Sequence, residues 1–469
     1  MRRQMKYKMA TGLLAAVLVC SALGGCTSAA PVGIEKTYIN DDGELLVVYS
    51  DGREENLGTV VGADGKDGTD GKDGADGKDG ADGKDGTDGK DGTDGKDGED
   101  GTDGEDGSVT IINKGSNIAY ATSKGLQSAV SVVCKFSPKQ TDWHKGEIKE
   151  DYNSSGSGVI YRLDKAKGDA FIITNFHVVY DADCDSYNGI SRDISVYLYG
   201  SEISGQEMKA EYVGGSDYYD IAVLHIKDSE LLQKSEAAAV TVSDSDKTVV
   251  GEAAIAIGNA KGEGTSASYG VVSVDSEHIA LTTLASGESQ TFRVIRVDTP
   301  VNPGNSGGGL YNESGELLGI VNAKLIDYTV ENIGYAIPSN VAVYVTDNII
   351  DHCYNGDYDN VQRGMLGVTV QTKESYMKTE KETGHVYIVE KVQVIDVLET
   401  SLVKGKVLPG DVLKYISFGD KRIDITRQFH VVDAMLNARE GDDITIGVVR
   451  DGKDVTVKVK MTKEHIIPY

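Results

Sequence analysis

The feature that most restricts the fold of this chain is a glycine at every third position from residue 62 to residue 107. Aspartate fills the last place of all fifteen triplets, and Ala, Lys, Thr or Glu fills the middle place. A three-chain helix of polyproline type requires this strict spacing, because only glycine fits at its crowded axis. The tract therefore favours an extended segment, and the 469-residue chain is long enough for two or three globular domains around it.

The sequence leaves two interpretations of this tract open. It resembles the collagen-like stalks of bacterial surface proteins, although it contains no proline to preset the extended geometry. The alternative is an acidic, disordered spacer, because fifteen Asp, two Glu and six Lys give it a charge of −11, out of −27 for the chain. At about 3 Å per residue an extended tract would span on the order of 100 Å in either case.

Residues 1–25 have the pattern of an export signal, with a positively charged start and an apolar run from about Ala10 to Leu23. The run is too short to predict a membrane-spanning helix. Residues 23–26, Leu-Gly-Gly-Cys, resemble a bacterial lipobox, which implies cleavage before Cys26 and lipidation of that cysteine. An ordinary signal peptide with an incidental Cys26 is the alternative. We therefore expect a lipid-anchored protein at the cell membrane, facing the extracytoplasmic side.

Composition narrows the classes of partner and cofactor. The net charge of −27 argues against a nucleic-acid partner. Only Cys134, Cys184 and Cys353 lie beyond the signal and lipobox, an odd and sparse set that predicts buried free thiols rather than disulfides. No pair of cysteines has metal-ligand spacing, so we expect no metal and no cofactor. Residues 26–61 are expected to form a short β segment or linker, with one or two hairpins.

After residue 107 the composition becomes that of a β-rich globular protein. Short Val- and Ile-rich runs alternate with Gly, Asn, Asp and Ser turns, which suggests a sandwich or barrel. The expected strands are residues 130–136, 158–163, 170–174, 194–199, 221–226, 253–257, 293–298 and 317–323.

A candidate nucleophile, Ser306, lies in the glycine-rich run of residues 301–310. Glycines there allow backbone N–H groups to turn toward an oxygen that becomes negative during attack. A serine nucleophile needs a base and a carboxylate that orients the base. His177 follows a strand-like run, and Asp220 precedes another, which gives the chain order His177, Asp220, Ser306. This is the chymotrypsin-type order and differs from those of subtilisin and the α/β-hydrolases.

The residues around these three positions closely resemble the catalytic motifs of HtrA/DegP-type serine proteases. The motifs are Thr-Asn-Phe-His-Val-Val at 174–179, Asp-Ile-Ala-Val-Leu at 220–224 and Asn-Pro-Gly-Asn-Ser-Gly-Gly at 302–308. The resemblance extends over about residues 124–469 and also includes segments 155–159, 256–259, 315–320 and 333–338. It implies a mostly β protein, in which a chymotrypsin-like double β-barrel at 117–358 precedes a PDZ domain at 361–463 and follows the Gly-X-Asp stalk at 62–107.

The resemblance also implies roles for individual residues. Ser306 attacks the peptide carbonyl, His177 acts as general base and then general acid, and Asp220 orients the imidazole. The backbone N–H groups of Gly304 and Ser306, together with Asn305, would form the oxyanion hole. The uncharged Pro300, six residues before the nucleophile, disfavours cleavage after Lys or Arg, and the pocket wall is expected from Val321, Asn322 and Ala323. A small or medium aliphatic residue before the cleaved bond is therefore expected.

In the last hundred residues the resemblance implies a PDZ groove. A peptide would add as a strand beside residues 366–370 and place its C-terminal carboxylate on the amides of Met365, Leu366 and Gly367. Val368 is also expected to contact the peptide. Residues 427–438 are expected to form the flanking helix, and residues 341–354 a helix that closes the protease domain. A PDZ-like packing module without a ligand is the alternative.

Together these features predict an envelope-anchored serine endopeptidase that degrades misfolded or exported proteins. C-terminal peptides are expected partners of the PDZ domain, and the resemblance implies a homotrimer. The alternative function, from a different class, is a collagen-like surface adhesin or holdase chaperone whose protease fold no longer cuts.

Overall fold

The computed structural model describes residues 34–40, 44–50, 52–59, 117–138, 150–184, 187–282, 287, 289–323, 333–353 and 361–468. The chain divides into two units, Met1–Asp103 and Gly104–Tyr469. In the first unit, β1 (Ile34–Ile39), β2 (Glu44–Tyr49) and β3 (Glu54–Thr59) form an antiparallel sheet in the order β1-β2-β3. The expected hairpins therefore exist as two successive ones. The export signal, Cys26 and the repeat of residues 62–107 lie outside the described residues.

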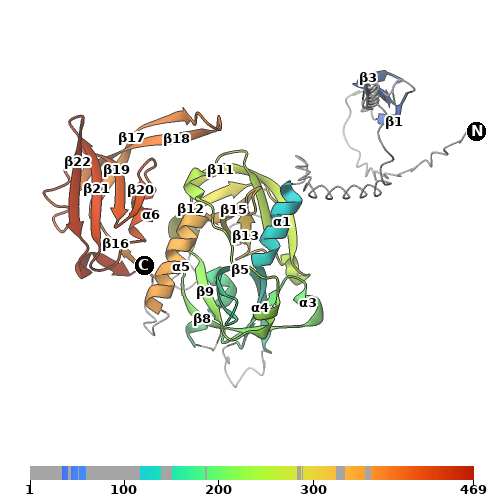
Figure 1. The fold of residues 1–469 in the computed structure, drawn as a ribbon, viewed down its shortest axis with the longest axis horizontal. Coiled ribbons are helices and arrows are strands. Elements are labelled where there is room, and N and C mark those ends of the chain that lie inside the picture. Colours follow the sequence, from blue (N-terminus) through green and yellow to red (C-terminus); the bar gives the residue numbers. More distant parts are fainter. Residues whose placement is uncertain are drawn as a thin grey trace, which may run out of the picture. The chain divides into compact units, whose positions relative to one another are not determined.

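The second unit begins with α1 (Asn117–Ser128) and a closed six-stranded barrel (Figure 1). The strands follow the order β4-β5-β6-β9-β8-β7 around the barrel, and β7 pairs with β4 to close it. They are β4 (Ala129–Phe136), β5 (Tyr152–Asp164), β6 (Asp169–Thr174), β7 (Asp193–Leu198), β8 (Met208–Ser216) and β9 (Ile221–Ile226). The barrel also carries α2 (Phe176–Val179), α3 (Ser201–Ser204), α4 (Glu230–Lys234) and the 3₁₀ turn η1 (Tyr187–Gly189).

A second closed barrel follows in the order β10-β11-β12-β15-β14-β13. Its strands are β10 (Ala253–Gly258), β11 (Ser266–Thr282), β12 (Ser289–Val297), β13 (Gly309–Tyr311), β14 (Leu317–Val321) and β15 (Gly334–Pro338). The 3₁₀ turns η2 (Ser245–Lys247) and η3 (Ala260–Gly262) flank β10. The expected mostly β class with a double barrel is therefore confirmed.

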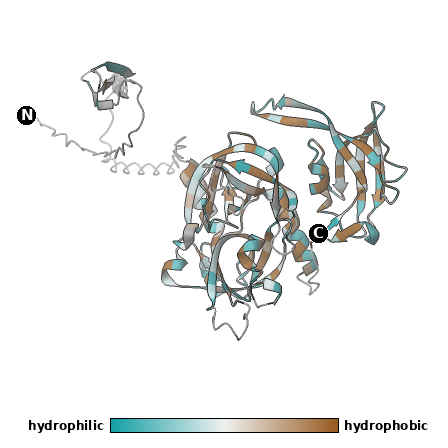
Figure 2. Cartoon of the chain, turned by 180° about the vertical axis from the view of Figure 1, so that it is seen from behind, coloured by the Kyte–Doolittle hydropathy of each residue, from teal (hydrophilic) through white to brown (hydrophobic). Residues whose placement is uncertain are grey.

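The helix α5 (Ser339–Cys353) holds the two barrels together. Its buried Val341, Val345 and Ile349 share one apolar cluster with Val223 of the first barrel and Ile337 of the second. Brown, apolar segments recur along the strands of both barrels in Figure 2, as burial of one side of each strand requires. None of the helices that the structure describes combines the length and the apolarity needed to cross a membrane.

A C-terminal β domain follows α5. Five strands pair in the order β17-β18-β19-β21-β22, and β20 pairs with β19, so that β17 and β22 are the two ends of this order. The strands are β17 (Val368–Thr379), β18 (Val386–Val397), β19 (Val412–Phe418), β20 (Lys421–Asp424), β21 (Asp443–Arg450) and β22 (Lys453–Lys460). A small sheet pairs β16 (Gln362–Gly364) with β23 (Ile466–Pro468), next to η5 (Lys463–His465). The domain's α-helix is α6 (His430–Met435).

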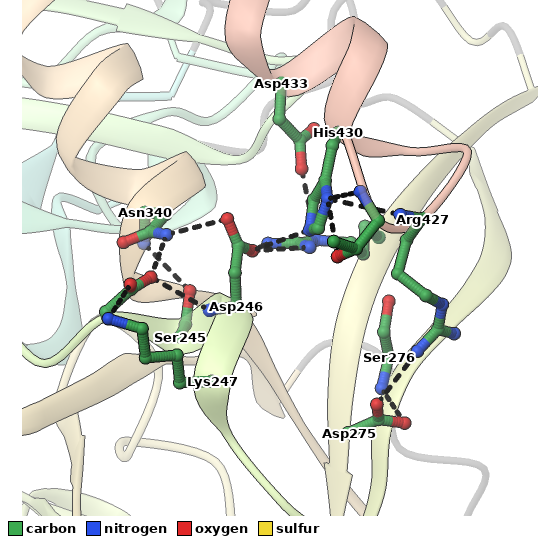
Figure 3. Close-up of polar contacts among 12 residues, drawn as sticks. Ser245, Asp246, Lys247, Asp275, Ser276, Asn340, Arg427, His430 and Asp433 are labelled. Atoms are coloured by element: carbon green, nitrogen blue, oxygen red, sulfur yellow. Dashed lines mark hydrogen bonds and ion pairs between the residues drawn. The ribbon is translucent and has the colours of Figure 1, made fainter. Parts of the chain in front are cut away.

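Buried charges join the C-terminal domain to the second barrel (Figure 3). The guanidinium of Arg293 in β12 donates two hydrogen bonds of 2.9 Å to Asp246 Oδ1, and its Nε lies 3.3 Å from Asp433 Oδ2 in α6. Arg293 also stacks on Phe429 at 4.0 Å. Nearby, Arg427 Nη1 donates to Asp275 Oδ2 at 3.0 Å. We call Asp246, Arg293, His430 and Asp433 the interdomain cluster.

Candidate active site

His177 and Asp220 form a closely bonded pair. His177 lies in the short helix α2 directly after β6, and Asp220 directly precedes β9, which pairs with β6. His177 Nδ1 is 2.7 Å from Asp220 Oδ2, and the His177 backbone N–H donates to Asp220 Oδ1 at 2.9 Å. Asp220 is 2% exposed. This contact holds one imidazole tautomer and leaves Nε2 to act as a base.

Two amides hold Asp220 in place. Asn322 donates from Nδ2 to Asp220 Oδ2 at 2.8 Å, and Asn175 donates from Nδ2 to the Asp220 carbonyl at 2.8 Å. Both amides are fully buried. Asp220 adopts a positive φ of 51°, which is unusual for a residue with a side chain and which these contacts support. This role of Asn322 cannot be predicted from the sequence, because residues 220 and 322 are far apart in the chain.

The turn that carries Ser306 contains two glycines in the left-handed region, Gly304 at φ 97° and Gly307 at φ 83°. The N–H groups of Asn305, Gly307 and Gly308 donate to the carbonyls of Asn302, Val321 and Asn305, respectively. Among the described residues, the N–H groups of Gly304 and Ser306 donate to no backbone carbonyl. The turn thus leaves two amides free on either side of a bonded one, an arrangement that suits an oxyanion.

Two connections place this turn beside the His–Asp pair. Ser306 O accepts the N–H of Ser157, and Val178, next to His177, packs on the neighbouring Gly156. On the other side, Val321 exchanges backbone hydrogen bonds with Gly307 and Gly308, and the following residue is the Asn322 that binds Asp220. Within the part of the chain that the structure describes, the Ser306 hydroxyl makes no hydrogen bond to His177; such contacts often tighten only when substrate binds.

The other predicted active-site residues take several positions. The Asn305 N–H is occupied by the Asn302 carbonyl at 3.0 Å, which leaves Gly304 and Ser306 as the available donors. Pro300 is exposed, and its carbonyl accepts from Ser268 at 2.8 Å. Val321 packs in the apolar core of the second barrel, the Asn322 side chain binds Asp220, and Ala323 is buried. The expected pocket wall therefore depends on Pro300 and Ala323, and it stays a prediction.

The predicted peptide groove lies at an open edge of the C-terminal sheet. Gly367 has a φ of 73°, and Met365 donates its N–H to the His465 carbonyl at 2.8 Å. For Leu366 and Gly367, the structure records no backbone carbonyl that accepts their N–H groups. Val368 begins β17, which pairs with β18 and with no other strand among those that the structure describes. A cavity of about 430 Å³ lies elsewhere, between the C-terminal domain and the second barrel, and none of the predicted site residues lines it.

Two segments of the chain match known protein families. A family profile described as a trypsin-like peptidase domain matches residues 156–320, a range that contains His177, Asp220 and Ser306. A second profile, described as a collagen triple helix repeat, matches residues 58–111. The collagen-like character of the repeat is therefore supported by its sequence.

Individual relatives match over most of the chain. A "Serine protease Do-like HtrA" from Lactococcus lactis subsp. cremoris is 28% identical over 76% of this chain and 87% of that protein. The protein of the same name from Lactococcus lactis subsp. lactis is 30% identical over 66% of this chain and 71% of that protein. "Periplasmic serine endoprotease DegP" from Escherichia coli is 31% identical over 67% of this chain and 58% of that protein.

Proposed function

This chain belongs to the HtrA/DegP-type serine proteases, and from that premise we propose that His177, Asp220 and Ser306 form the catalytic triad of a serine endopeptidase that acts on unfolded or exported proteins. One observation carries the proposal. The Ser306 turn keeps the N–H groups of Gly304 and Ser306 free. It is also linked through Asn322 to the Asp220 carboxylate, which is hydrogen-bonded to His177.

In the proposed reaction His177 Nε2 takes the proton of the Ser306 hydroxyl as Oγ attacks the peptide carbonyl. The imidazolium that results is stabilised by Asp220. The carbonyl oxygen becomes negative and accepts hydrogen bonds from the N–H groups of Gly304 and Ser306. His177 then protonates the leaving amine, and a water molecule hydrolyses the acyl-enzyme in the reverse sense.

The test compares casein hydrolysis by the wild-type protein and by Ser306→Ala. A matched control is Ser191→Ala, since Ser191 is also a buried serine; its hydroxyl donates to the Lys135 carbonyl at 2.8 Å, away from the proposed triad. We expect Ser306→Ala to lose at least ~10³-fold in rate, because the nucleophile is removed. Equal hydrolysis by Ser306→Ala and wild type would refute the proposal and favour the adhesin or holdase alternative.

We also propose that the enzyme is a lipoprotein on the extracytoplasmic side of the membrane. The export-signal pattern of residues 1–25 and Cys26 support this location, as do the names of relatives from Haemophilus influenzae and Escherichia coli, which are called periplasmic. Growth with a labelled fatty acid should label wild type and leave Cys26→Ser unlabelled. Equal labelling of both proteins would refute the proposed lipidation of Cys26.

For the C-terminal domain we propose a PDZ-type peptide site at β17. Val370 lies opposite Val394, whose N–H and C=O bond to Asp411 and Gly410, so the backbone groups of Val370 face the open edge. A C-terminal peptide would pair there as an added strand, and its carboxylate would reach the N–H groups of Leu366 and Gly367. Because Gln428 Nε2 lies 3.5 Å from the Val370 carbonyl, that side chain would have to move.

We further propose a homotrimer whose stalk and protease share one threefold axis, because the collagen-like repeat is three-stranded where it folds. Light scattering of the full mature chain and of a deletion of residues 62–107 tests this. Loss of trimers on deletion is expected. Unchanged trimers would assign assembly to the protease domain alone.

A further inference from the structure

We propose that Ser157 positions the oxyanion-binding amides of this protease. The inference rests on the proposed triad and deepens it. Ser157 lies in β5 of the first barrel, whereas Ser306 lies in a turn of the second. The residue is 0% exposed, so its hydroxyl neither contacts water nor reaches a substrate. It acts on the reaction only through the backbone that it binds.

Every polar group of Ser157 is used. Its Oγ donates to the Gly304 carbonyl at 2.7 Å, and its N–H donates to the Ser306 carbonyl at 2.8 Å. The same Oγ accepts the N–H of Asn259 at 2.8 Å, and the Ser157 carbonyl accepts from Thr174 Oγ1 at 2.7 Å. One residue of the first barrel therefore bonds to the carbonyls of both residues whose amides are proposed to hold the oxyanion.

These bonds determine how the peptide planes of the turn are oriented. In a trans peptide the C=O and N–H point in opposite directions, so a bond to each side holds the plane. The plane between Gly304 and Asn305 is held by Ser157 Oγ on one side and by the Asn302 carbonyl on the other. The plane between Ser306 and Gly307 is held in the same way by the Ser157 N–H and the Val321 carbonyl.

Gly304 has conformational freedom that this turn must restrict. It has no side chain, so several orientations of its peptide planes are accessible to it. Its buried carbonyl has Ser157 Oγ as its hydrogen-bond donor among the described residues. Without that donor the Gly304–Asn305 plane could turn so that the carbonyl finds another partner. The Gly304 N–H belongs to the preceding peptide plane, and it would be displaced because the Cα of Gly304 would lose its anchor to Ser157.

Ser157 also ties the nucleophile to the base. The Thr174 hydroxyl that donates to Ser157 belongs to the residue before Asn175, which binds the Asp220 carbonyl. Serine at position 157 thus joins the end of β6, after which His177 follows, to the Ser306 turn. If Ser157 only completed the packing of the barrel, its replacement by alanine would lower stability without a selective loss of kcat. The two roles can therefore be distinguished by measurement.

The experiment compares wild type, Ser157→Ala, the control Ser191→Ala and Ser306→Ala as full mature chains. The control matches well, because Ser191 Oγ donates to the Lys135 carbonyl at 2.8 Å and accepts the Asp193 N–H at 3.3 Å. For Ser157→Ala we expect kcat on casein to fall ~10–100-fold with KM changed by less than about twofold, since losing one oxyanion donor outright costs about 10²–10³-fold. The rate of inactivation by a fluorophosphonate should fall by the same factor.

If Ser157→Ala keeps the wild-type kcat and inactivation rate while Ser306→Ala is inactive, the positioning role of Ser157 is refuted and the proposed triad is not. Full activity in Ser306→Ala would instead remove the proposed triad and this inference with it. If Ser157→Ala does not fold, Ser157→Cys keeps the side-chain volume with a weaker donor. Its kcat per folded molecule should fall at least about fivefold, and an unchanged value would overturn the proposal.

Discussion

Replacing Arg293 by Met should loosen the C-terminal domain from the protease. Arg293 is the cation of the interdomain cluster, its side chain is 4% exposed, and it faces the carboxylates of Asp246 and Asp433. Burial raises the pKa of Asp433 above its ordinary value, in spite of the opposing charge of Arg293. Burial also disfavours the charged form of Asp246, yet nearby His430 and Arg293 outweigh it and hold the pKa of Asp246 below its ordinary value.

The expected loss in the free energy of unfolding follows from the contacts of Arg293 that methionine cannot make. Met keeps the apolar contact with Phe429 but leaves the carboxylates of Asp433 and Asp246 without the guanidinium between them. Breaking a buried ion pair from one side costs ~3–5 kcal/mol, a large share of the ~5–15 kcal/mol that holds a domain folded. The loss should be full at pH 8 and shrink toward pH 5. Without Arg293 the folded pKa of Asp433, already raised by burial, rises further above the unfolded value of about 3.9, and this destabilisation is relieved as that carboxylate protonates.

The measurement is urea unfolding in a Ser306→Ala background, which prevents self-digestion, with limited proteolysis to follow release of the C-terminal domain. Arg422→Met is the matched control, because Arg422 also pairs with an aspartate and stacks on a ring, Tyr415 at 3.9 Å, but is 54% exposed. It should cost less than about 1 kcal/mol. Equal stability of the two variants at pH 8, or a loss for Arg293→Met that grows as the pH falls, would refute the reasoning.

Three further predictions concern the active site and the peptide edge. Asn322→Ala should lower kcat on casein ~10–100-fold with little change in KM, since it removes a hydrogen bond to the charged Asp220 worth about 1.5–3 kcal/mol; an unchanged kcat would contradict this. Gly307→Ala should lower the melting temperature and abolish activity, because a Cβ there would lie 2.2 Å from the Ser157 carbonyl at a φ of 83°; normal melting would show that the turn is not constrained. Val370→Pro should weaken binding of a labelled C-terminal peptide at least about tenfold in fluorescence anisotropy while leaving the circular dichroism unchanged, since the lost N–H faces the open edge rather than β18; equal affinity would place the peptide elsewhere.

The sequence predicted those parts of the molecule that depend on local pattern. Strand β9 was expected over residues 221–226 and has those bounds, because all six of its side chains are buried and leave an unbroken apolar run. The sequence does not predict strand β11, since Ser266–Thr282 is rich in polar residues and half-exposed. The helix expected over residues 427–438 is α-helical only at His430–Met435, because the turns on either side use bonds of three-residue spacing, such as Leu436 N–H to the Asp433 carbonyl.

The same contrast holds for the candidate site. The positions of His177, Asp220 and Ser306 could be inferred from chain order and motif, and the structure brings their segments together. The contacts of Asn322 and Ser157 could not be inferred in this way. Each is a hydrogen bond between residues more than a hundred positions apart, and the packing of the two barrels against each other brings these residues together. Expectations that fall on residues 1–33 and 62–107 remain predictions.

The closure of both barrels also limits where the proposed unfolded substrates could pair with strands of the enzyme. Unfolded chains pair readily with any exposed strand, and a closed barrel offers none. The two outer strands of the larger C-terminal sheet both carry lysines, and β22 carries more of them in a shorter strand. Strand β22 carries Lys453, Lys458 and Lys460, which discourage a sticky strand from docking, whereas β17 presents the backbone of Val370. The edge of β17, where we propose that peptides bind, is therefore the place at which this sheet can accept an added strand.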